Sequence, residues 1–229
     1  MKTKAKCVVL TGAGISAESG LSTFRDNDGL WANYRIEEVC TPEALARNPQ
    51  KVIEFYNYRR QEAEKAQPNA GHLALVELEE RYEVKIVTQN VDNLHEKAGS
   101  STVLHLHGQL NKLRSSFDED YVIDWQGDQP LDLCDPQGHP MRPHIVFFGE
   151  SVPLLDTAID WVAEADVLII IGTSMQVYPA NTLIQYARPR AEIYFIDPHP
   201  QNTGSRAKVI AEKAGVGVLR VVKDLLAKS

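Results

Sequence analysis

Short apolar runs without polar interruption recur along the chain, and each ends in small or polar turn residues. They are rich in β-branched residues, and runs of this kind are typical of strands buried on both faces of a parallel sheet. We expect four such strands, over residues 7–10, 84–87, 167–171 and 193–196.

Between these runs, apolar residues recur with the period of an amphipathic helix. Strands that alternate with helices over a whole chain predict a doubly wound parallel sheet. The expected fold class is therefore α/β and Rossmann-like. The expected helices are 72–81, 155–165 and 216–227, and the expected core comprises residues 7–26, 69–108 and 145–229.

Two stretches do not follow this alternation. Residues 27–68 contain helical segments without a buried strand, and residues 109–144 are polar, acidic and rich in turn residues. We expect both to be insertions that form a smaller lobe over one edge of the sheet, so that residues 1–229 make a single domain.

The composition is that of a globular protein and limits its partners. Of 229 residues, 43% are hydrophobic and 24% charged, and the formal net charge is −7. This charge argues against a general nucleic-acid-binding surface. The apolar runs are too short for a secretory signal or a membrane span. We expect a cytoplasmic protein with neither a nucleic-acid nor a membrane partner.

The first expected strand runs into a glycine-rich turn, residues 12–20. Glycines at this place allow a backbone to approach a pyrophosphate at the start of a helix. Their spacing departs from the dehydrogenase fingerprint, and no acidic residue ends a second strand about 20 residues later. The turn therefore gives little support to a hydride-transfer enzyme, and a purely structural turn is the alternative.

Two further polar clusters lie at strand ends. Gln89, Asn90 and Asp92 follow the second strand and suit the recognition of ribose hydroxyls and a carboxamide, although an ordinary helix N-cap is the alternative. Residues 172–174 follow the most apolar strand. In open α/β sheets the ligand crevice lies at these carboxyl ends, so the clusters predict one ligand site.

A pair of histidines closes another short apolar run. Alternation along a strand places His105 and His107 on one face, next to Gly108. A single histidine is more often structural than catalytic. A neutral imidazole at a strand end beside a polar loop can, however, accept a proton from a hydroxyl near neutral pH.

In this order, the motifs resemble those of the sirtuins, a family of NAD-dependent protein deacylases. The resemblance extends from residue 8 to residue 226. The matching segments are 12–20, 23–25, 89–92, 105–108, 146–150 and 172–174.

The resemblance implies a binding site for NAD as cosubstrate. A loop with Phe24, Arg25 and Trp31 would close over NAD, Ala214 would contact adenine, and Asp197 stands where many members place an Asn for the adenosine ribose. The residues implied to bind NAD are Gly12, Ala13, Gly14, Ser16, Ala17, Glu18, Phe24, Arg25, Trp31, Gln89, Asn90, Asp92, Gly172, Thr173, Ser174, Asp197 and Ala214.

The resemblance also implies a reaction that uses no metal. The acyl-lysine carbonyl oxygen attacks C1′ of the nicotinamide ribose and nicotinamide leaves. His107 then acts as general base on a ribose hydroxyl, and the acyl group leaves on ADP-ribose; Asn90 and Asp92 are the other implied catalytic residues. The acylated protein would pair with an edge strand formed by Val146, Phe147, Phe148, Gly149 and Glu150.

Tyr56 and Arg59 stand three residues apart on a predicted helix and are therefore neighbours on one face. Such a pair usually marks a solvated face. Here it resembles the signature of sirtuins that remove succinyl, malonyl and glutaryl groups, in which a guanidinium and a phenol bind a terminal carboxylate. We predict a desuccinylase and demalonylase that retains some deacetylase activity. The alternatives are a mono-ADP-ribosyltransferase, a Rossmann oxidoreductase and a noncatalytic NAD-binding sensor.

The chain departs from the family pattern in its cysteines. Most sirtuins carry two Cys-x-x-Cys pairs in the second insertion, where they bind structural zinc, but this chain has only Cys134 there. Its three cysteines are too far apart for a four-cysteine site, and Cys134 with His139 and His144 lacks the spacing of a closed site. We expect no zinc. The expected apolar anchors of the insertion are Phe117, Tyr121, Ile123, Trp125, Leu131 and Leu133.

Overall fold

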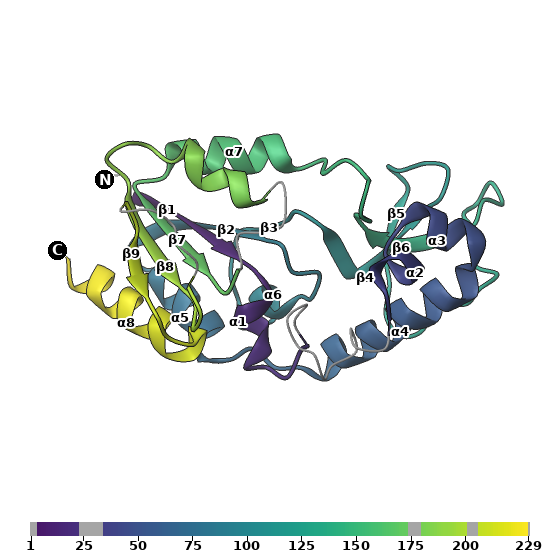
Figure 1. Ribbon diagram of the computed structural model, residues 1–229, viewed down its shortest axis with the longest axis horizontal. Coiled ribbons are helices and arrows are strands. Elements are labelled where there is room, and N and C mark those ends of the chain that lie inside the picture. Colours follow the sequence, from purple (N-terminus) through teal and green to yellow (C-terminus); the bar gives the residue numbers. More distant parts are fainter. Residues whose placement is uncertain (1–3, 23–33, 174–179, 201–205, 229) are drawn as a thin grey trace.

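The computed structural model describes residues 4–22, 34–173, 180–200 and 206–228 (Figure 1). In this part of the chain, a six-stranded parallel sheet with helices on both faces forms the large lobe, and a three-stranded antiparallel sheet with helices forms the small lobe. The α/β fold class predicted from the sequence is confirmed.

The strand order of the large sheet places the ligand edge. It runs β3-β2-β1-β7-β8-β9, so β1 pairs with β2 on one side and with β7 on the other. The order reverses between β1 and β7, and ligands of open α/β sheets bind outside the carboxyl ends of strands at such a point. The strands are β1 Ala5–Thr11, β2 Tyr82–Thr88, β3 Val103–His105, β7 Val167–Ile171, β8 Glu192–Ile196 and β9 Lys208–Ile210.

The unbroken apolar runs form the central strands, as predicted. Every residue of β7 is buried, and so are the last five of β1. Apolar side chains on both faces of these strands pack into two separate cores, one on each side of the sheet. The sequence does not predict β9, because Lys208 and Val209 are exposed and the strand has no apolar run.

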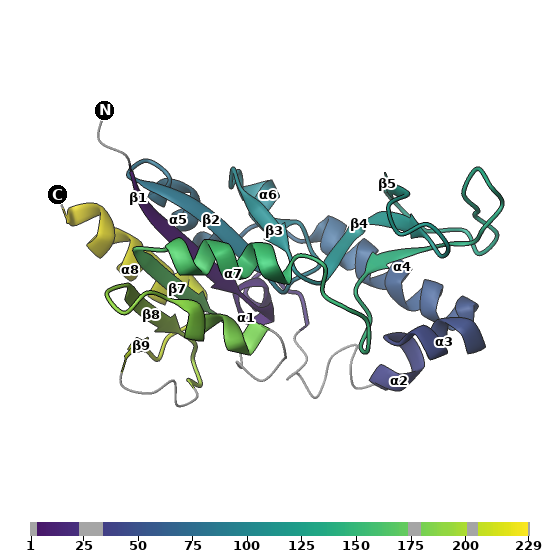
Figure 2. The same cartoon turned by 90° about the horizontal axis from the view of Figure 1, so that it is seen from above.

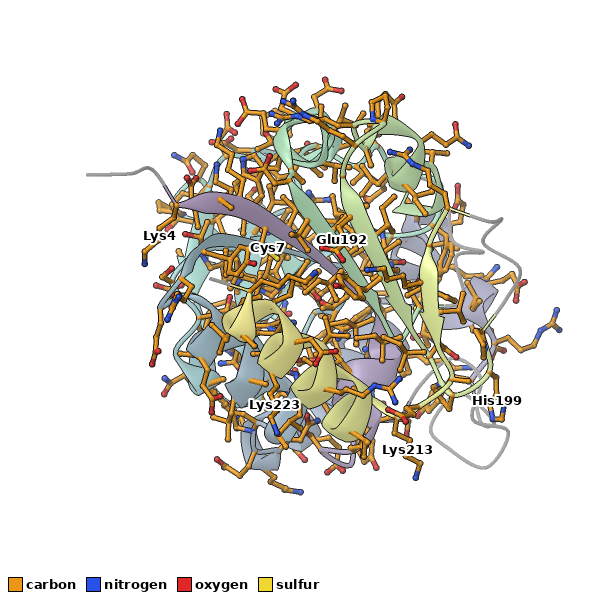
Figure 3. All side chains as sticks on the ribbon, turned by 90° about the vertical axis from the view of Figure 1, so that its left-hand side faces the viewer. Lys4, Cys7, Glu192, His199, Lys213 and Lys223 are labelled. Atoms are coloured by element: carbon orange, nitrogen blue, oxygen red, sulfur yellow. The ribbon has the colours of Figure 1, made fainter. Side chains whose placement is uncertain are left out.

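Helices cover both faces of this sheet (Figures 1 and 2). Helix α8 packs against α5 and closes one face, and α7 with the 3₁₀ helix η2 covers the other. Figure 3 shows α8 along the sheet, where Lys228 near its end donates to Glu192 at the start of β8 (2.7 Å). The elements are α1 Ala13–Ala17, α5 Ala70–Leu78, α6 Leu94–Ala98, α7 Leu155–Glu164, η2 Ala180–Tyr186 and α8 Ala214–Ala227.

The small lobe combines both insertions. Its sheet has the order β5-β4-β6, and apolar side chains from α2, α4, β4 and β6 form its core. The sequence does not predict this sheet, because a register shift interrupts the alternation of β4 and because β5 is largely exposed. The elements are α2 Ile36–Val39, α3 Pro42–Arg47, α4 Pro49–Lys65, β4 Gly108–Ser115, β5 Val122–Asp124 and β6 Met141–Ile145.

The expectation that apolar anchors hold the second insertion is wrong. Phe117 and Leu131 are 76% and 52% exposed, and Tyr121, Ile123, Trp125 and Leu133 are only partly buried. The centre of this region is instead a buried carboxylate, Asp135.

Asp135 accepts four hydrogen bonds. The donors are the hydroxyl of Ser115 (2.7 Å), the backbone N–H groups of Gln137 and His139 (2.9 Å each) and Nδ1 of His139 (3.1 Å). Burial alone would raise the pKa of Asp135, but these donors outweigh burial and lower it to about 2. A charged hydrogen-bond acceptor therefore organises a turn-rich segment that has few apolar contacts.

Two negative findings apply to the described residues alone. Their helices include none with the length and apolar character needed to cross a bilayer. They also include no group of three or more His, Cys, Asp or Glu side chains placed to hold a metal ion.

Candidate active site

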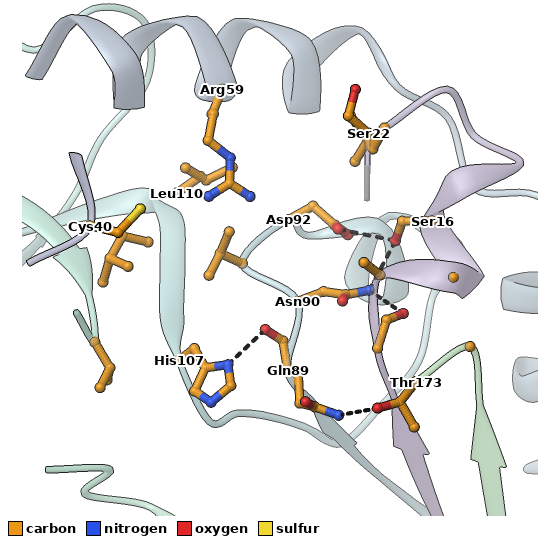
Figure 4. A pocket seen from close by; sticks show the side chains of 18 of the residues that line it. Ser16, Ser22, Cys40, Arg59, Gln89, Asn90, Asp92, His107, Leu110 and Thr173 are labelled. Carbon is orange, nitrogen blue, oxygen red and sulfur yellow. Dashed lines mark hydrogen bonds between the residues drawn. The ribbon is translucent and has the colours of Figure 1, made fainter. Parts of the chain in front are cut away.

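A cavity of 1410 Å³ lies between the two lobes, at the carboxyl ends of β1, β2 and β7. The large lobe contributes the three polar strand-end clusters predicted from the sequence. The small lobe contributes α4 and the segment after β6. Figure 4 shows side chains of both lobes, among them Gln89, His107 and Arg59, directed toward this space.

The glycines after β1 allow two strand-end loops to touch. Gly12 and Gly14 donate their backbone N–H groups to the carbonyls of Ile171 (3.0 Å) and Gly172 (2.8 Å) after β7. A Cβ on Gly14 would lie 2.6 Å from Gly172 Cα, and Gly172 has a φ of +58°. Side chains would thus separate the loops. The structural-turn interpretation is confirmed for these glycines, and they also line the cavity.

Asn90, Ser16 and Asp92 form a hydrogen-bonded network. The Asn90 amide donates to the carbonyl of Gly12 (3.1 Å) and to Ser16 Oγ (3.0 Å), and the Ser16 hydroxyl donates to Asp92 Oδ2 (3.0 Å). Asp92 Oδ1 accepts from the N–H of Leu94 at the start of α6 (3.1 Å), so the capping alternative is also confirmed. Burial raises the pKa of Asp92. The network fixes two side chains that line the cavity.

His107 has the tautomer that a general base needs. Its Nδ1 lies 3.1 Å from the carbonyl oxygen of Gln89, which can only accept, so Nδ1 carries the proton and Nε2 has the free lone pair. Burial lowers the pKa of His107 below the ordinary 6.5, although the bond to Gln89 acts in the opposite direction. The Gln89 amide donates to Thr173 Oγ1 (3.1 Å), which ties β2 to β7. His107 is therefore neutral near pH 7.

The second histidine of the motif faces elsewhere. His105 and His107 line different cavities, because β3 ends at His105 and its alternation goes no further; the shared face predicted from the sequence is wrong. Nδ1 of His105 lies 2.9 Å from the carbonyl oxygen of Asn90, and Nε2 lies 2.7 Å from Glu96 Oε1. Both partners accept, so only an imidazolium can donate to both. His105 thus supports the Asn90 loop.

Tyr56 and Arg59 lie on the same face of α4 and line the cavity from the small lobe, as their spacing predicts. Pro49 begins this helix, and the Asn48 side chain caps it. Tyr56 is 1% exposed, and its hydroxyl donates to the thiol of Cys40 at 3.4 Å. The sequence gives no signal for Cys40, because it belongs to neither a motif nor a periodic segment.

The segment after β6 is a turn. The predicted edge strand is wrong for residues 146–150, because β6 ends at Ile145 and Gly149 has a φ of +91°. The N–H groups of residues 146 and 148 donate within the protein, to the carbonyls of His107 (3.0 Å) and Cys40 (2.9 Å). A substrate backbone must therefore use other groups of this segment, which lines the cavity.

The remaining predicted residues occupy several positions. Phe24, Arg25, Trp31 and Ser174 lie outside the described residues. Ala13, Ala17, Glu18 and Asp197 line the cavity, whereas Ala214 is buried outside the lining and its neighbour Lys213 takes that place. Glu18 also accepts from the N–H of Gly215 in α8 (2.6 Å).

Comparison with known proteins identifies the family. The model of the Sir2 family matches residues 12–179, which includes each of the strand-end clusters described above. The chain belongs to the Sir2 family. This Sir2 protein is 63% identical over 198 residues to an NAD-dependent protein deacylase of Aggregatibacter actinomycetemcomitans, with 86% of this chain and 95% of that protein covered.

Other relatives cover this Sir2 protein almost completely. An NAD-dependent protein deacylase of Bacteroides thetaiotaomicron is 48% identical over 232 residues, covering 96% of this chain and 97% of that protein. Among solved structures, a complex of a mutant Sir2 homologue with ADP-ribose has a TM-score of 0.90 at 40% identity, covering 99% of this chain and 95% of that chain. A Sir2 homologue–NAD complex has a TM-score of 0.89 at 40% identity, covering 97% and 90%.

The residues of this Sir2 protein fit NAD. Its cavity lies at the point where the strand order reverses, and two buried polar side chains, Asn90 and Asp92, line it. Amide, carboxylate and hydroxyl groups are the partners that a carboxamide and ribose hydroxyls require.

Proposed function

We propose that this Sir2 protein is an NAD-dependent protein-lysine deacylase that prefers succinyl and malonyl groups and retains some deacetylase activity. The supporting observation is that one cavity joins a neutral histidine, at its large-lobe end, to Arg59 and Tyr56 on α4. A proton acceptor and a cation for the acyl group are thus combined in a single site.

NAD would be held at the large-lobe end. Bound NAD supplies an electrophilic ribose carbon with nicotinamide as leaving group. The Asn90–Ser16–Asp92 network would orient the carboxamide and ribose, and Gly172 and Thr173 would contact the phosphates and adenosine side. Glycine-rich turns at the ends of parallel strands present backbone N–H groups to phosphates in many folds.

His107 would act as the general base. Its Nε2 has the free lone pair and accepts the proton of a ribose hydroxyl, while the Gln89 carbonyl keeps Nδ1 protonated and holds the ring in orientation. A base of this kind contributes about two to four orders of magnitude in rate. Because the pKa of His107 lies below 6.5, the base is already unprotonated at neutral pH.

The acyl group would lie against the small lobe. Arg59 can bind a terminal carboxylate with two parallel hydrogen bonds. Tyr56 can exchange its bond to the Cys40 sulfur, a weak acceptor, for a stronger bond to a carboxylate oxygen. Burial raises the pKa of the Cys40 thiol, so it stays neutral beside the incoming anion. An acetyl group lacks the carboxylate and gains none of this.

The test is a side-by-side assay of one peptide that carries acetyl-, succinyl- or malonyl-lysine, with and without NAD. We expect NAD-dependent release of nicotinamide and formation of O-acyl-ADP-ribose, with the larger kcat/KM for the two anionic groups. His107→Ala should lower turnover on all three by about 10²–10⁴-fold. ADP-ribose attached to protein, or cofactor reduction at about 340 nm, would replace the proposed function with one of its alternatives.

Arg59→Met separates the acyl preference from the chemistry. Loss of one charge-assisted contact should lower kcat/KM for the succinyl peptide by about 10–100-fold and leave the acetyl peptide nearly unchanged. Arg220→Met is the matched control, since Arg220 pairs with Glu212 on the exposed side of α8. Equal losses on both peptides would show that Arg59 does not bind the carboxylate.

We propose, in addition, that the small lobe holds its shape without zinc. The support is the bonding around Asp135, which engages Ser115 and Nδ1 of His139. The protein purified without chelators should contain much less than one zinc per chain, and EDTA should leave its Tm unchanged. Stoichiometric zinc would contradict this proposal.

A further inference from the structure

A buried ion cluster lies behind the segment that follows β6. Glu150 accepts from Arg142 Nη1 (2.6 Å) and Nη2 (3.2 Å) and from Arg114 Nη2 (3.2 Å). The side chains of both arginines are 9% exposed, and that of Glu150 is 19% exposed. The carboxylate also accepts from the backbone N–H of Phe147 at 2.7 Å. Glu150 thus turns inward and fixes the start of its own turn.

Arg142 extends this cluster to the acyl end of the cavity. Its guanidinium carbon lies 4.0 Å from the centre of the Phe147 ring, and the Phe147 ring stacks on Tyr56 with centroids 5.7 Å apart and planes at 25°. Phe147 and Tyr56 line the cavity, but Arg142 does not. A planar cation outside the site therefore supports an aromatic wall inside it.

Two further bonds close this arrangement into a ring. The Tyr56 hydroxyl donates to the sulfur of Cys40, and the carbonyl of Cys40 accepts from the N–H of Phe148 (2.9 Å). Phe148 follows Phe147 directly in the chain. The position of the Phe147 ring is thus fixed on one side by Arg142 and on the other by Tyr56 and Cys40.

We propose that Arg142 is a positioning residue that determines acyl-group selectivity through the Phe147 ring. The proposal rests on the proposed deacylase function but not on Arg59, since it concerns the shape of the pocket wall rather than its charge. Groups that reach past the first carbon of the acyl chain contact this wall, whereas an acetyl group contacts less of it.

The variant for the test is Arg142→Lys, with Arg220→Lys as its matched control. Lysine keeps a positive charge beside Glu150, but an ammonium can neither stack flat on Phe147 nor bind both carboxylate oxygens in parallel. We expect KM for butyryl- and succinyl-lysine peptides to rise about tenfold, with KM for the acetyl peptide changed by less than about twofold. KM for NAD should stay at the wild-type value.

A double-variant cycle tests whether Arg142 acts through Phe147. Phe147→Leu alone should reproduce the selective rise in KM, and Arg142→Lys should add little to it in the Phe147→Leu background. The proposal is overturned if the two changes add fully. It is also overturned if all three peptides and NAD weaken in parallel with a fall in Tm, or if Arg142→Lys behaves as Arg220→Lys does.

The neutral butyryl group separates this proposal from the preference for anionic acyl groups. If the wild-type enzyme prefers acetyl over succinyl peptides, the proposed acyl preference fails, and the butyryl-to-acetyl comparison still reports on the wall. If Arg59→Met behaves as proposed and Arg142→Lys leaves the butyryl-to-acetyl ratio unchanged, only the role of Arg142 fails.

Discussion

The two lobes build the same cavity by different physical means. In the large lobe, a sheet with two apolar faces sets the backbone, and the polar groups of the site follow at the strand ends. In the small lobe, buried charged groups hold the backbone. Arg60, 1% exposed, donates to the carbonyls of Leu110 (2.7 Å) and Gly127 (3.2 Å), and Asp135 and Glu150 bind several donors each.

This difference determines how each lobe responds to change. Apolar burial is not directional and is shared among many contacts, so one substitution lowers the stability of the whole sheet. Buried hydrogen bonds are directional, and removal of one partner leaves the other unsatisfied at one place. Damage should therefore be global in the large lobe and local in the small lobe.

The largest effect is expected in the large lobe. Ile169 in β7 is 0% exposed and lies in the core on the side of α5 and α8. Ile169→Ala should lower the free energy of unfolding by about 2–5 kcal/mol, because it removes buried methyl groups and leaves a cavity. Urea titration followed by circular dichroism measures this. A loss well below 1 kcal/mol would show that the sheet core repacks easily.

The next largest effect is acid destabilisation of the large lobe. His72 is 0% exposed, and burial lowers its pKa to about 4; the pKa of His95, beside it, is also lowered by burial. An unfolded histidine binds a proton below about pH 6.5, so this stability is complete above pH 6.5 and is lost as the pH falls toward 4. His72 alone should account for about 3 kcal/mol of the loss.

Urea titrations between about pH 7.5 and pH 4.5 check this dependence. His72→Asn should weaken the pH dependence, whereas His199→Asn, at an exposed position near the end of β8 (Figure 3), should leave it unchanged. Equal stability at both ends of this range would contradict the assignment of His72 as a buried neutral residue.

The same contrast explains what the sequence predicts of the fold. Runs such as that of β7 predict the large sheet, because burial on both faces requires an unbroken apolar segment. No such rule applies to β4, where the alternation is shifted, or to Asp135, whose burial depends on partners up to 20 residues away. Polar partners carry no periodicity, so the small sheet and its charged centre are visible only in the structure.

The site follows the same division. His107, Asn90 and Asp92 are predicted from the sequence, because polar residues after buried strands meet at one edge of a sheet. Cys40 and Arg142 are not predicted, because their roles arise from contacts across the small lobe. The turn at residues 146–150 is also missed, since an apolar segment next to a glycine resembles a strand end until its hydrogen bonds are known.

A local effect is expected at Asp135. Asp135→Asn replaces one acceptor oxygen by an NH₂ group that faces other donors, so the bonds from Ser115 and His139 cannot all form. Hydrogen exchange should become faster in β4 and β6 and stay unchanged in β1 and β7. Asp132→Asn, at an exposed position, is the matched control. Faster exchange throughout the large lobe would contradict the independence of the two lobes.

The smallest effect is expected at an exposed ion pair. Arg220 and Glu212 lie 3.0 Å apart with side chains 54% and 32% exposed, so Arg220→Met should change the free energy of unfolding by less than about 1 kcal/mol. Arg142→Met removes the same chemical partner from a buried carboxylate and should cost about 3–5 kcal/mol. The two variants differ in the burial of the pair and little else. Equal losses in urea titration would mean that burial does not distinguish the two pairs, and would remove the physical basis for treating the small lobe as held together by its charges.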